Sequence, residues 1–83
     1  MSAKPAAADV ENALRAAGQA HHDYEGNFLN GEADKQWAGW YAGYVLGRLG
    51  DFTSPTSLAR MLADAPSSDD WASAAARYVT EKL

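Results

Sequence analysis

Apolar residues recur at alternating spacings of three and four positions through the first third of the chain. The series consists of Val10, Leu14, Ala17, His21, Tyr24 and Phe28. This spacing places side chains on one face of an α-helix. Because proline suits the first helical position, we expect a helix from about Pro5 to about Tyr24, preceded by frayed residues 1–4.

Two turn signals surround an adjacent apolar pair after this first helix. Gly26-Asn27 precedes Phe28 and Leu29, and Asn30-Gly31 follows them. Both dipeptides are typical of turns. We therefore expect a loop whose Phe28 and Leu29 fold inward, because a loop facing solvent would gain nothing from two large apolar side chains.

The segment from about Asp34 to Leu49 is the most apolar part of the chain, and it predicts the second helix. At about 100° per residue, its side chains separate into three faces of different chemistry. The aromatic face holds Trp37, Trp40, Tyr41 and Tyr44, the aliphatic face holds Ala38, Ala42, Val45, Leu46 and Leu49, and the glycine face holds Gly39, Gly43 and Gly47. A helix with so little polar surface is expected to be covered nearly all round, as the central element of the fold.

The glycine face predicts an interface. Residues Gly39, Gly43 and Gly47 repeat every four positions, as in the small-xxx-small pattern that lets two helix backbones approach closely. Glycine inside a helix costs about 1 kcal/mol relative to alanine, so three of them are unfavourable without a close partner. The run from Trp37 to Leu49 is too short for a membrane span, which needs about 20 apolar residues.

Two shorter helices follow, each with a recognisable start. Gly50 closes the second helix as a glycine C-cap, and Ser54-Pro55 opens the third with an N-cap and a proline at the first position. Ala65-Pro66 ends that helix. The fourth is expected to begin at Ser67 or Ser68, with Asp69 and Asp70 in its first turn, where the helix dipole favours negative charge. Its inner face is expected to hold Trp71, Ala75, Tyr78, Val79 and Leu83.

These elements predict an all-α fold: one domain spanning residues 1–83, built as a compact bundle of about four helices around an aromatic-rich second helix. Eighteen alanines and the absence of cysteine indicate a helical chain held together without disulfides. A domain this short buries a modest fraction of its surface, which favours oligomerisation.

The charge distribution argues against nucleic-acid and anionic membrane partners. The formal net charge is −4, and the seven basic residues are scattered singly from Lys4 to Lys82. Binding to phosphates or anionic lipids draws on clustered Lys and Arg side chains. The polar N-terminus carries no secretory signal pattern, so a cytoplasmic location is expected.

The only two histidines stand beside two carboxylates and a phenol in the stretch His21-His22-Asp23-Tyr24-Glu25. On a helix, Glu25 shares a face with either histidine, but adjacent histidines point about 100° apart and cannot easily ligate one metal. Further ligands would be needed, with Glu32 and Asp34 nearest, and we predict neither a metal nor a cofactor. Two interpretations stay open for His21: a partly buried residue hydrogen-bonded to Glu25 or a loop carbonyl, or a general base oriented by Glu25 in a pocket with Tyr24 or Tyr41.

Two interpretations also hold for the aromatic face. Trp37, Trp40, Tyr41 and Tyr44 fit the wall of a small-molecule pocket, since aromatic walls with a few polar groups are typical of such sites. In a chain poor in large aliphatic residues they equally serve to fill the core.

The histidine and tryptophan stretches together resemble a known pattern. Residues His21-His22-Asp23-Tyr24-Glu25 and Asp34-Lys35-Gln36-Trp37-Ala38-Gly39-Trp40-Tyr41-Ala42 are similar to H-x-x-Y-E followed by D-x-x-W-x-x-W-Y-A, found in small uncharacterised bacterial helical proteins. Members often carry proline where this chain has Ala38. The resemblance implies no activity. It implies that the histidine, acidic and aromatic positions occur together, as a pocket or a packed interface would require.

The sequence thus supports two hypotheses of function. The first is a non-enzymatic interaction or structural module that self-associates, or docks on a protein partner, through Gly39, Gly43 and Gly47 or a nearby aromatic patch. The alternative is a small-molecule binder or weak enzyme whose pocket lies between His21, Tyr24 and Glu25 on the first helix and Trp37, Trp40 and Tyr41 on the second.

Overall fold

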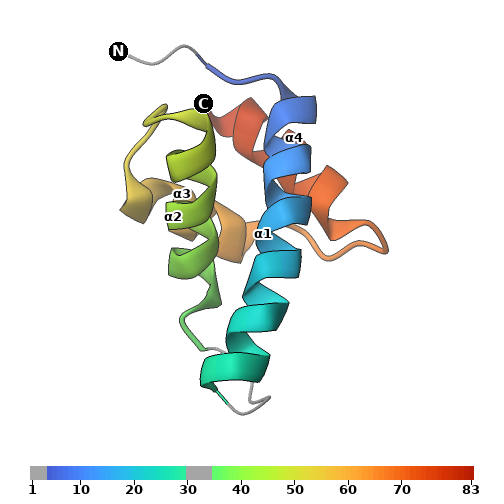
Figure 1. The fold of residues 1–83 in the computed structure, drawn as a ribbon. Coiled ribbons are helices and arrows are strands. Elements are labelled where there is room, and N and C mark those ends of the chain that lie inside the picture. The colour runs from blue at the N-terminus through green and yellow to red at the C-terminus, as the bar shows by residue number, and fades with distance from the viewer. Residues whose placement is uncertain (1–3, 30–34) are drawn as a thin grey trace.

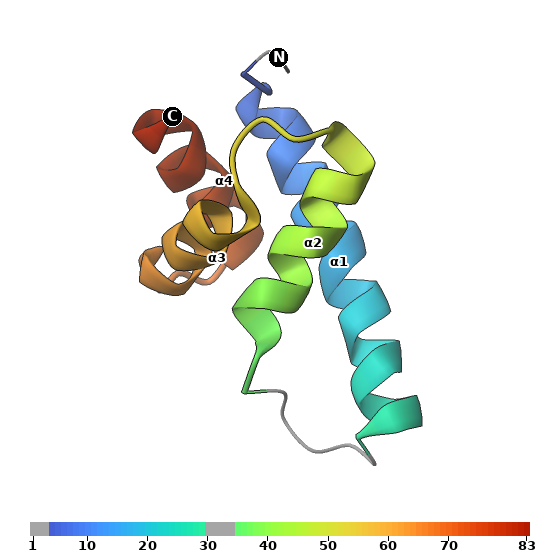
Figure 2. The same ribbon diagram turned by 90° about the vertical axis from the view of Figure 1, so that its left-hand side faces the viewer.

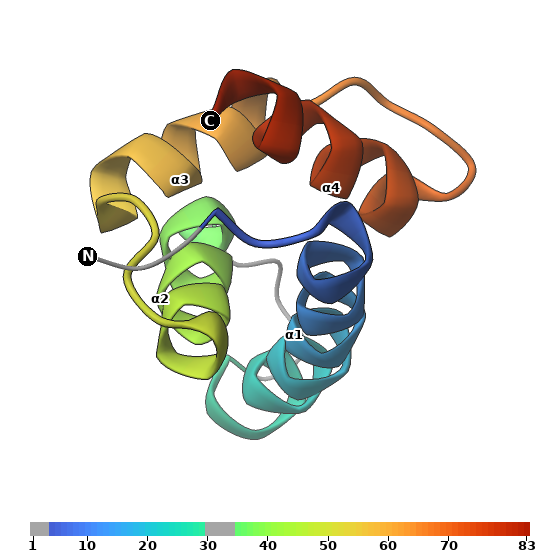
Figure 3. The same cartoon turned by 90° about the horizontal axis from the view of Figure 1, so that it is seen from above.

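Four α-helices make up the part of the chain that the computed structural model describes, residues 4–29 and 35–83. They are α1 (Ala7–Phe28), α2 (Trp37–Leu49), α3 (Pro55–Asp64) and α4 (Trp71–Lys82). Helices α1 and α2 run side by side in opposite directions (Figure 1), and α3 and α4 lie across them as a second layer (Figure 2). Seen from above, the four helices surround one common centre (Figure 3). The fold is an all-α four-helix bundle, as predicted.

All four helices contribute buried side chains to a single core. The buried apolar residues that form it are Val10, Ala13, Leu14, Ala42, Val45, Leu46, Leu58, Leu62, Ala75, Ala76 and Val79. The periodic stripe predicted for the first helix is buried from Val10 through His21. Four of these core positions are alanines, and the large aromatic rings pack outside the fully buried core, partly buried against it at Trp37, Tyr41 and Trp71.

Helix α1 is longer than predicted and continues through Gly26-Asn27 to Phe28. The prediction that Phe28 folds inward is wrong, since its side chain is 74% exposed. Its ring instead contacts that of Tyr24 one turn earlier, with centroids 5.5 Å apart, so helical spacing continues past the expected end. Leu29 is half-buried directly after the helix. The second turn signal, Asn30-Gly31, and the predicted fraying of residues 1–3 lie outside the described residues.

Helix α2 keeps the three faces but is not covered all round. It packs against α1 and α3, and its aliphatic face is buried at Ala42, Val45 and Leu46. The glycine face is exposed along its whole length, so the prediction of nearly complete burial is wrong. The reason is that α4 packs against α1 and α3, on the other side of the core. The helix begins at Trp37, and the predicted start at Asp34 falls outside the described residues.

The predicted caps of α2 and α3 are confirmed. Gly50 follows α2 with a φ of 92°, which favours glycine, and its N–H donates to the carbonyl of Leu46. Ser54 caps α3, its Oγ accepting a hydrogen bond of 3.1 Å from the N–H of Ser57, and Pro55 occupies the first helical position.

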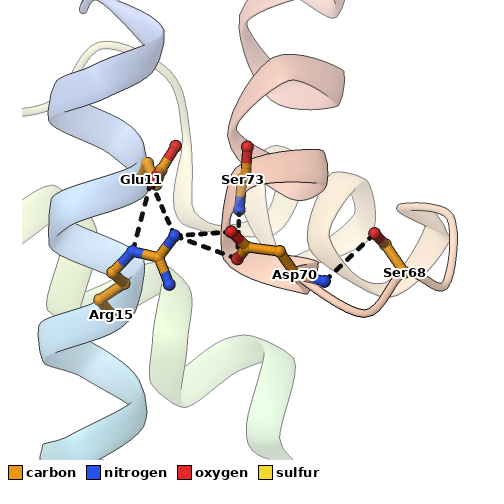
Figure 4. Close-up of polar contacts among 5 residues, drawn as sticks. All are labelled: Glu11, Arg15, Ser68, Asp70 and Ser73. Atoms are coloured by element: carbon orange, nitrogen blue, oxygen red, sulfur yellow. Dashed lines mark hydrogen bonds and ion pairs between the residues drawn. The ribbon is translucent and has the colours of Figure 1, made fainter.

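Helix α4 begins at Trp71, later than predicted, because Asp70 acts as its N-cap rather than as a first-turn residue. The Asp70 carboxylate accepts a hydrogen bond from the N–H of Ser73 and two more from Arg15 of α1, at 2.9 and 3.0 Å (Figure 4). Arg15 also donates to Glu11 one turn earlier on α1. The Arg15 bonds keep the pKa of Asp70 below its usual range, and those to Asp70 and Glu11 raise the pKa of Arg15. This network ties the start of α4 to α1. At the other end of α4, the side chain of Leu83, which was predicted to face inward, is exposed.

Candidate functional site

A cluster of aromatic rings joins α1, α2 and the start of α4 at one end of the α1–α2 pair. Helix α1 contributes His21, Tyr24 and Phe28, α2 contributes Trp37, Trp40, Tyr41 and Tyr44, and α4 contributes Trp71. Residues three and four apart on each helix share a face, so two short stretches are enough to build it. The structure therefore brings the six sequence-predicted ligand residues into one region.

His21 is the buried centre of this cluster, with only 5% of the residue exposed. Its ring centroid lies 4.9 Å from that of Trp40, 5.2 Å from that of Tyr41 and 6.0 Å from that of Tyr24. Its Nδ1 lies 3.8 Å from the Glu25 carboxylate, one turn further along α1. The neighbouring His22 is exposed, as the helical geometry predicts. Three rings and one carboxylate thus surround a single imidazole.

Tyr41 lies between α1 and the bundle core, and its hydroxyl reaches Gly18 of α1. A Cβ atom at Gly18 would stand 3.3 Å from the Tyr41 Oη, which is tighter than ordinary contact. Burial raises the pKa of the Tyr41 phenol, and the negative charge of Glu25 raises it further. The phenol therefore keeps its proton near neutral pH. In this form it can donate a hydrogen bond.

Trp71 of α4 also belongs to the cluster, which the sequence pattern did not predict. Its ring meets Trp37 edge to face with centroids 5.6 Å apart, and Tyr41 at 5.9 Å. Edge-to-face contacts of this kind add about 0.5–1.5 kcal/mol beyond burial of apolar area. The position of Trp71 directly after the helix cap Asp70 indicates that its ring starts the inner face of α4. Nothing in the sequence tells which helix that ring meets.

The remaining rings form a row along the outside of the α1–α2 seam. This outer aromatic row runs Phe28, Tyr24, Trp40, Tyr44, with successive centroids 5.5, 5.8 and 5.7 Å apart. Phe28 is mostly exposed and the other three are half-buried. The row borders the glycine face, because Trp40 lies about 60° from the midline of that face on α2.

The glycine face itself is open. A Cβ atom placed at Gly39, Gly43 or Gly47 would meet no atom of the described residues within 4 Å, outside its own stretch of helix. All three residues are exposed. Among the described residues, the face therefore has neither the close partner nor the side-chain cover that would offset the cost of glycine in a helix.

The described residues offer little that could bind a metal. Within residues 4–29 and 35–83, no three His, Asp or Glu side chains gather as a metal would require. Glu32 and Asp34, the additional ligands considered from the sequence, lie outside the described residues. No described helix is long and apolar enough to cross a bilayer. What the cluster offers chemically is a buried imidazole, a carboxylate and a protonated phenol, set in aromatic walls.

Comparison with known proteins gives no further lead. No protein-family model matches the chain, and neither the curated proteins nor the solved structures contain a match to it. The resemblance to small bacterial helical proteins therefore stays a prediction.

Proposed function

We propose that the chain is a non-enzymatic interaction module that pairs with a second copy of itself through the glycine face of α2. The observation that carries the proposal is the open space beside Gly39, Gly43 and Gly47. Each glycine costs about 1 kcal/mol relative to alanine, and the contacts of the bundle do not offset that cost. Close approach of a second helix would supply the missing packing, since small residues let two backbones come near.

The outer aromatic row supports the same proposal. Phe28 is 74% exposed at one end of the row, beside half-buried Tyr24, Trp40 and Tyr44. Exposed apolar surface is thermodynamically unfavourable in water, and aromatic residues are enriched at protein–protein interfaces. A helix lying on the glycine face would also cover the edge of Trp40, so both surfaces would be used at once.

Substitution of Gly43 by leucine tests the proposal without a folding artefact. Because Cβ at this position has open space around it, Gly43→Leu is expected to fold and to gain helix propensity. Gly26→Leu is the matched control, since Gly26 is a glycine of α1 with the same open surroundings outside the glycine face.

Light scattering coupled to size-exclusion chromatography gives the readout. The natural chain and Gly26→Leu are expected to associate as concentration rises, whereas Gly43→Leu stays monomeric. A natural chain that is monomeric at every concentration would contradict self-association, and so would an unchanged dimer in Gly43→Leu.

A second candidate, a small-molecule binder at the α1–α2 seam, is favoured by one observation: the buried His21 ring lies between Trp40 and Tyr41, with the Glu25 carboxylate at 3.8 Å. A ligand of this site would shift the NMR signals of the His21 ring while leaving exposed His22 unchanged. It would also raise the melting temperature through binding linkage. A metabolite library without either effect would argue for the interaction module alone.

A further inference from the structure

A separate groove is lined by residues from the turn after α2, from α3 and from the end of α4. Figure 2 shows α3 and the end of α4 lying next to each other in the second layer of the bundle. The volume of the groove is about 530 Å³, within the range of about 300–1,000 Å³ that small-molecule sites occupy. Its lining includes none of the residues of the glycine face or of the aromatic cluster. It is therefore independent of the proposed function.

The apolar part of the groove comes from Phe52, Met61, Tyr78 and Leu83. Phe52 and Met61 are half-buried and pack against the core, so they are held by the bundle. The N–H of Phe52 also donates to the carbonyl of Gly50 at 2.9 Å, which fixes the tight turn after α2. These contacts hold the Phe52 and Met61 side chains in place before any ligand binds.

Three charged side chains also line the groove: Arg60 and Asp64 from α3, and Lys82 from α4. Arg60 and Asp64 stand four positions apart on one helix, yet the ion pairs of the described residues include neither of them, nor Lys82. The Lys82 ammonium instead lies 5.2 Å from the centre of the Tyr78 ring. Both cations thus keep their hydrogen-bonding capacity for a ligand, beside apolar surface.

We propose that this groove binds a small monocarboxylate with an aromatic or branched apolar body. The guanidinium of Arg60 would hold the carboxylate with paired hydrogen bonds, and Lys82 would add a second positive charge. The apolar body would lie on Phe52 and Met61. Two cations and one carboxylate leave a net side-chain charge of +1, which complements one negative charge on the ligand. Asp64 would repel a second.

Phenylacetate and its neutral isostere phenylacetamide test this assignment. Titrated into isotope-labelled protein, phenylacetate is expected to shift the backbone amide signals of Phe52, Ser57 and Met61, with a dissociation constant in the millimolar range. Phenylacetamide keeps the ring but lacks the charge, so it is expected to bind at least about tenfold more weakly. Equal binding of the two compounds, shifts confined to other regions, or no saturable shift with phenylacetate would each overturn the proposal.

Two variants test whether the positive charge of Arg60 is the one that binds the carboxylate. Arg60→Gln is expected to weaken phenylacetate binding about tenfold or more while leaving the circular dichroism spectrum unchanged, because Arg60 is exposed. Arg48→Gln removes the same charge from the exposed end of α2, outside the groove, and is expected to bind as the natural chain does. Equal weakening by both substitutions would show a general effect of net charge and would contradict a site at Arg60.

Discussion

The hydroxyl of Tyr41 lies against Gly18 and would crowd a side chain at that position. A Cβ atom at Gly18 would stand 3.3 Å from that oxygen, so glycine here has a packing reason within the bundle. At Gly43 no such reason exists, since the corresponding space is open. The two positions separate a glycine with a packing neighbour in the bundle from one without such a neighbour among the described residues.

This contrast gives a double-mutant prediction. Alanine at position 18 gains up to about 1 kcal/mol of helix propensity but must displace the Tyr41 hydroxyl by a few tenths of an ångström. In the natural chain we expect Gly18→Ala to change the free energy of unfolding little. In the Tyr41→Phe background, which lacks the hydroxyl, the same substitution should stabilise by about 0.5–1 kcal/mol.

Urea denaturation of the four proteins of the cycle measures the coupling. Equal effects of Gly18→Ala in both backgrounds would mean that the Tyr41 hydroxyl does not restrict position 18.

Tyr41 also predicts how stability responds to alkali. Its pKa in the folded chain is raised, first by burial and then by the charge of Glu25, above the usual value of about 10. As pH rises past that usual value, the unfolded chain releases the phenol proton before the folded chain does. The contribution of this group to stability is therefore complete below about pH 10 and is lost as pH rises through the folded pKa.

The measurement is the free energy of unfolding across this pH window, with phenolate formation followed by ultraviolet difference spectroscopy. Tyr41→Phe should make the loss of stability shallower. If the slope is the same in both proteins, the loss comes from other groups.

The Arg15–Asp70 pair predicts the opposite response in acid. The pKa of Asp70 is lowered mainly by its hydrogen bonds with Arg15, so its contribution to stability is present above the usual carboxyl pKa and is lost as pH falls through the folded value. Because both side chains are exposed, the effect should be small and should shrink in high salt. Arg15→Gln should flatten the acid limb of the stability curve, and it should leave the N-cap bond from Ser73 in place.

Asp70→Asn is the informative companion, since asparagine also caps helices but carries no charge. It should reproduce the pH behaviour of Arg15→Gln. Asp70→Ala should destabilise more, because it removes the cap as well, and an Asp70→Ala variant as stable as Asp70→Asn would contradict the capping role.

The fold was predictable to the extent that local patterns determine it. The spacing of Val10, Leu14 and Ala17 and the Ser54-Pro55 start each depend on one helix alone, and the structure has them as expected. Errors arose where two local signals compete. Gly26-Asn27 is typical of a turn, but α1 continues through it to Phe28, whose ring packs on Tyr24 within the same helix.

The sequence predicted which residues α1 and α2 contribute to the candidate site, but not how the helices bring them together. Helical spacing already places His21 with Tyr24, and Trp37 with Tyr41, but which helices meet depends on long-range packing. That is why Trp71, which touches both Trp37 and Tyr41, and the Arg15–Asp70 bond were missed. The exposure of the glycine face could not be predicted either, since the sequence of α2 alone does not reveal which of its sides the bundle covers.

Leu62 and Phe28 are both large apolar residues, but they differ strongly in burial. Truncating each of them to alanine therefore tests how much burial contributes to stability. Leu62 is 1% exposed in the core, and Phe28 is 74% exposed at the end of α1. Leu62→Ala should cost about 2–5 kcal/mol, through lost burial and the cavity left behind, a large share of the stability of a domain this small. Phe28→Ala should change the stability of the monomer by no more than about 0.5 kcal/mol. Chemical denaturation at low protein concentration measures both, and a large loss in Phe28→Ala would mean that Phe28 folds inward as the sequence first predicts.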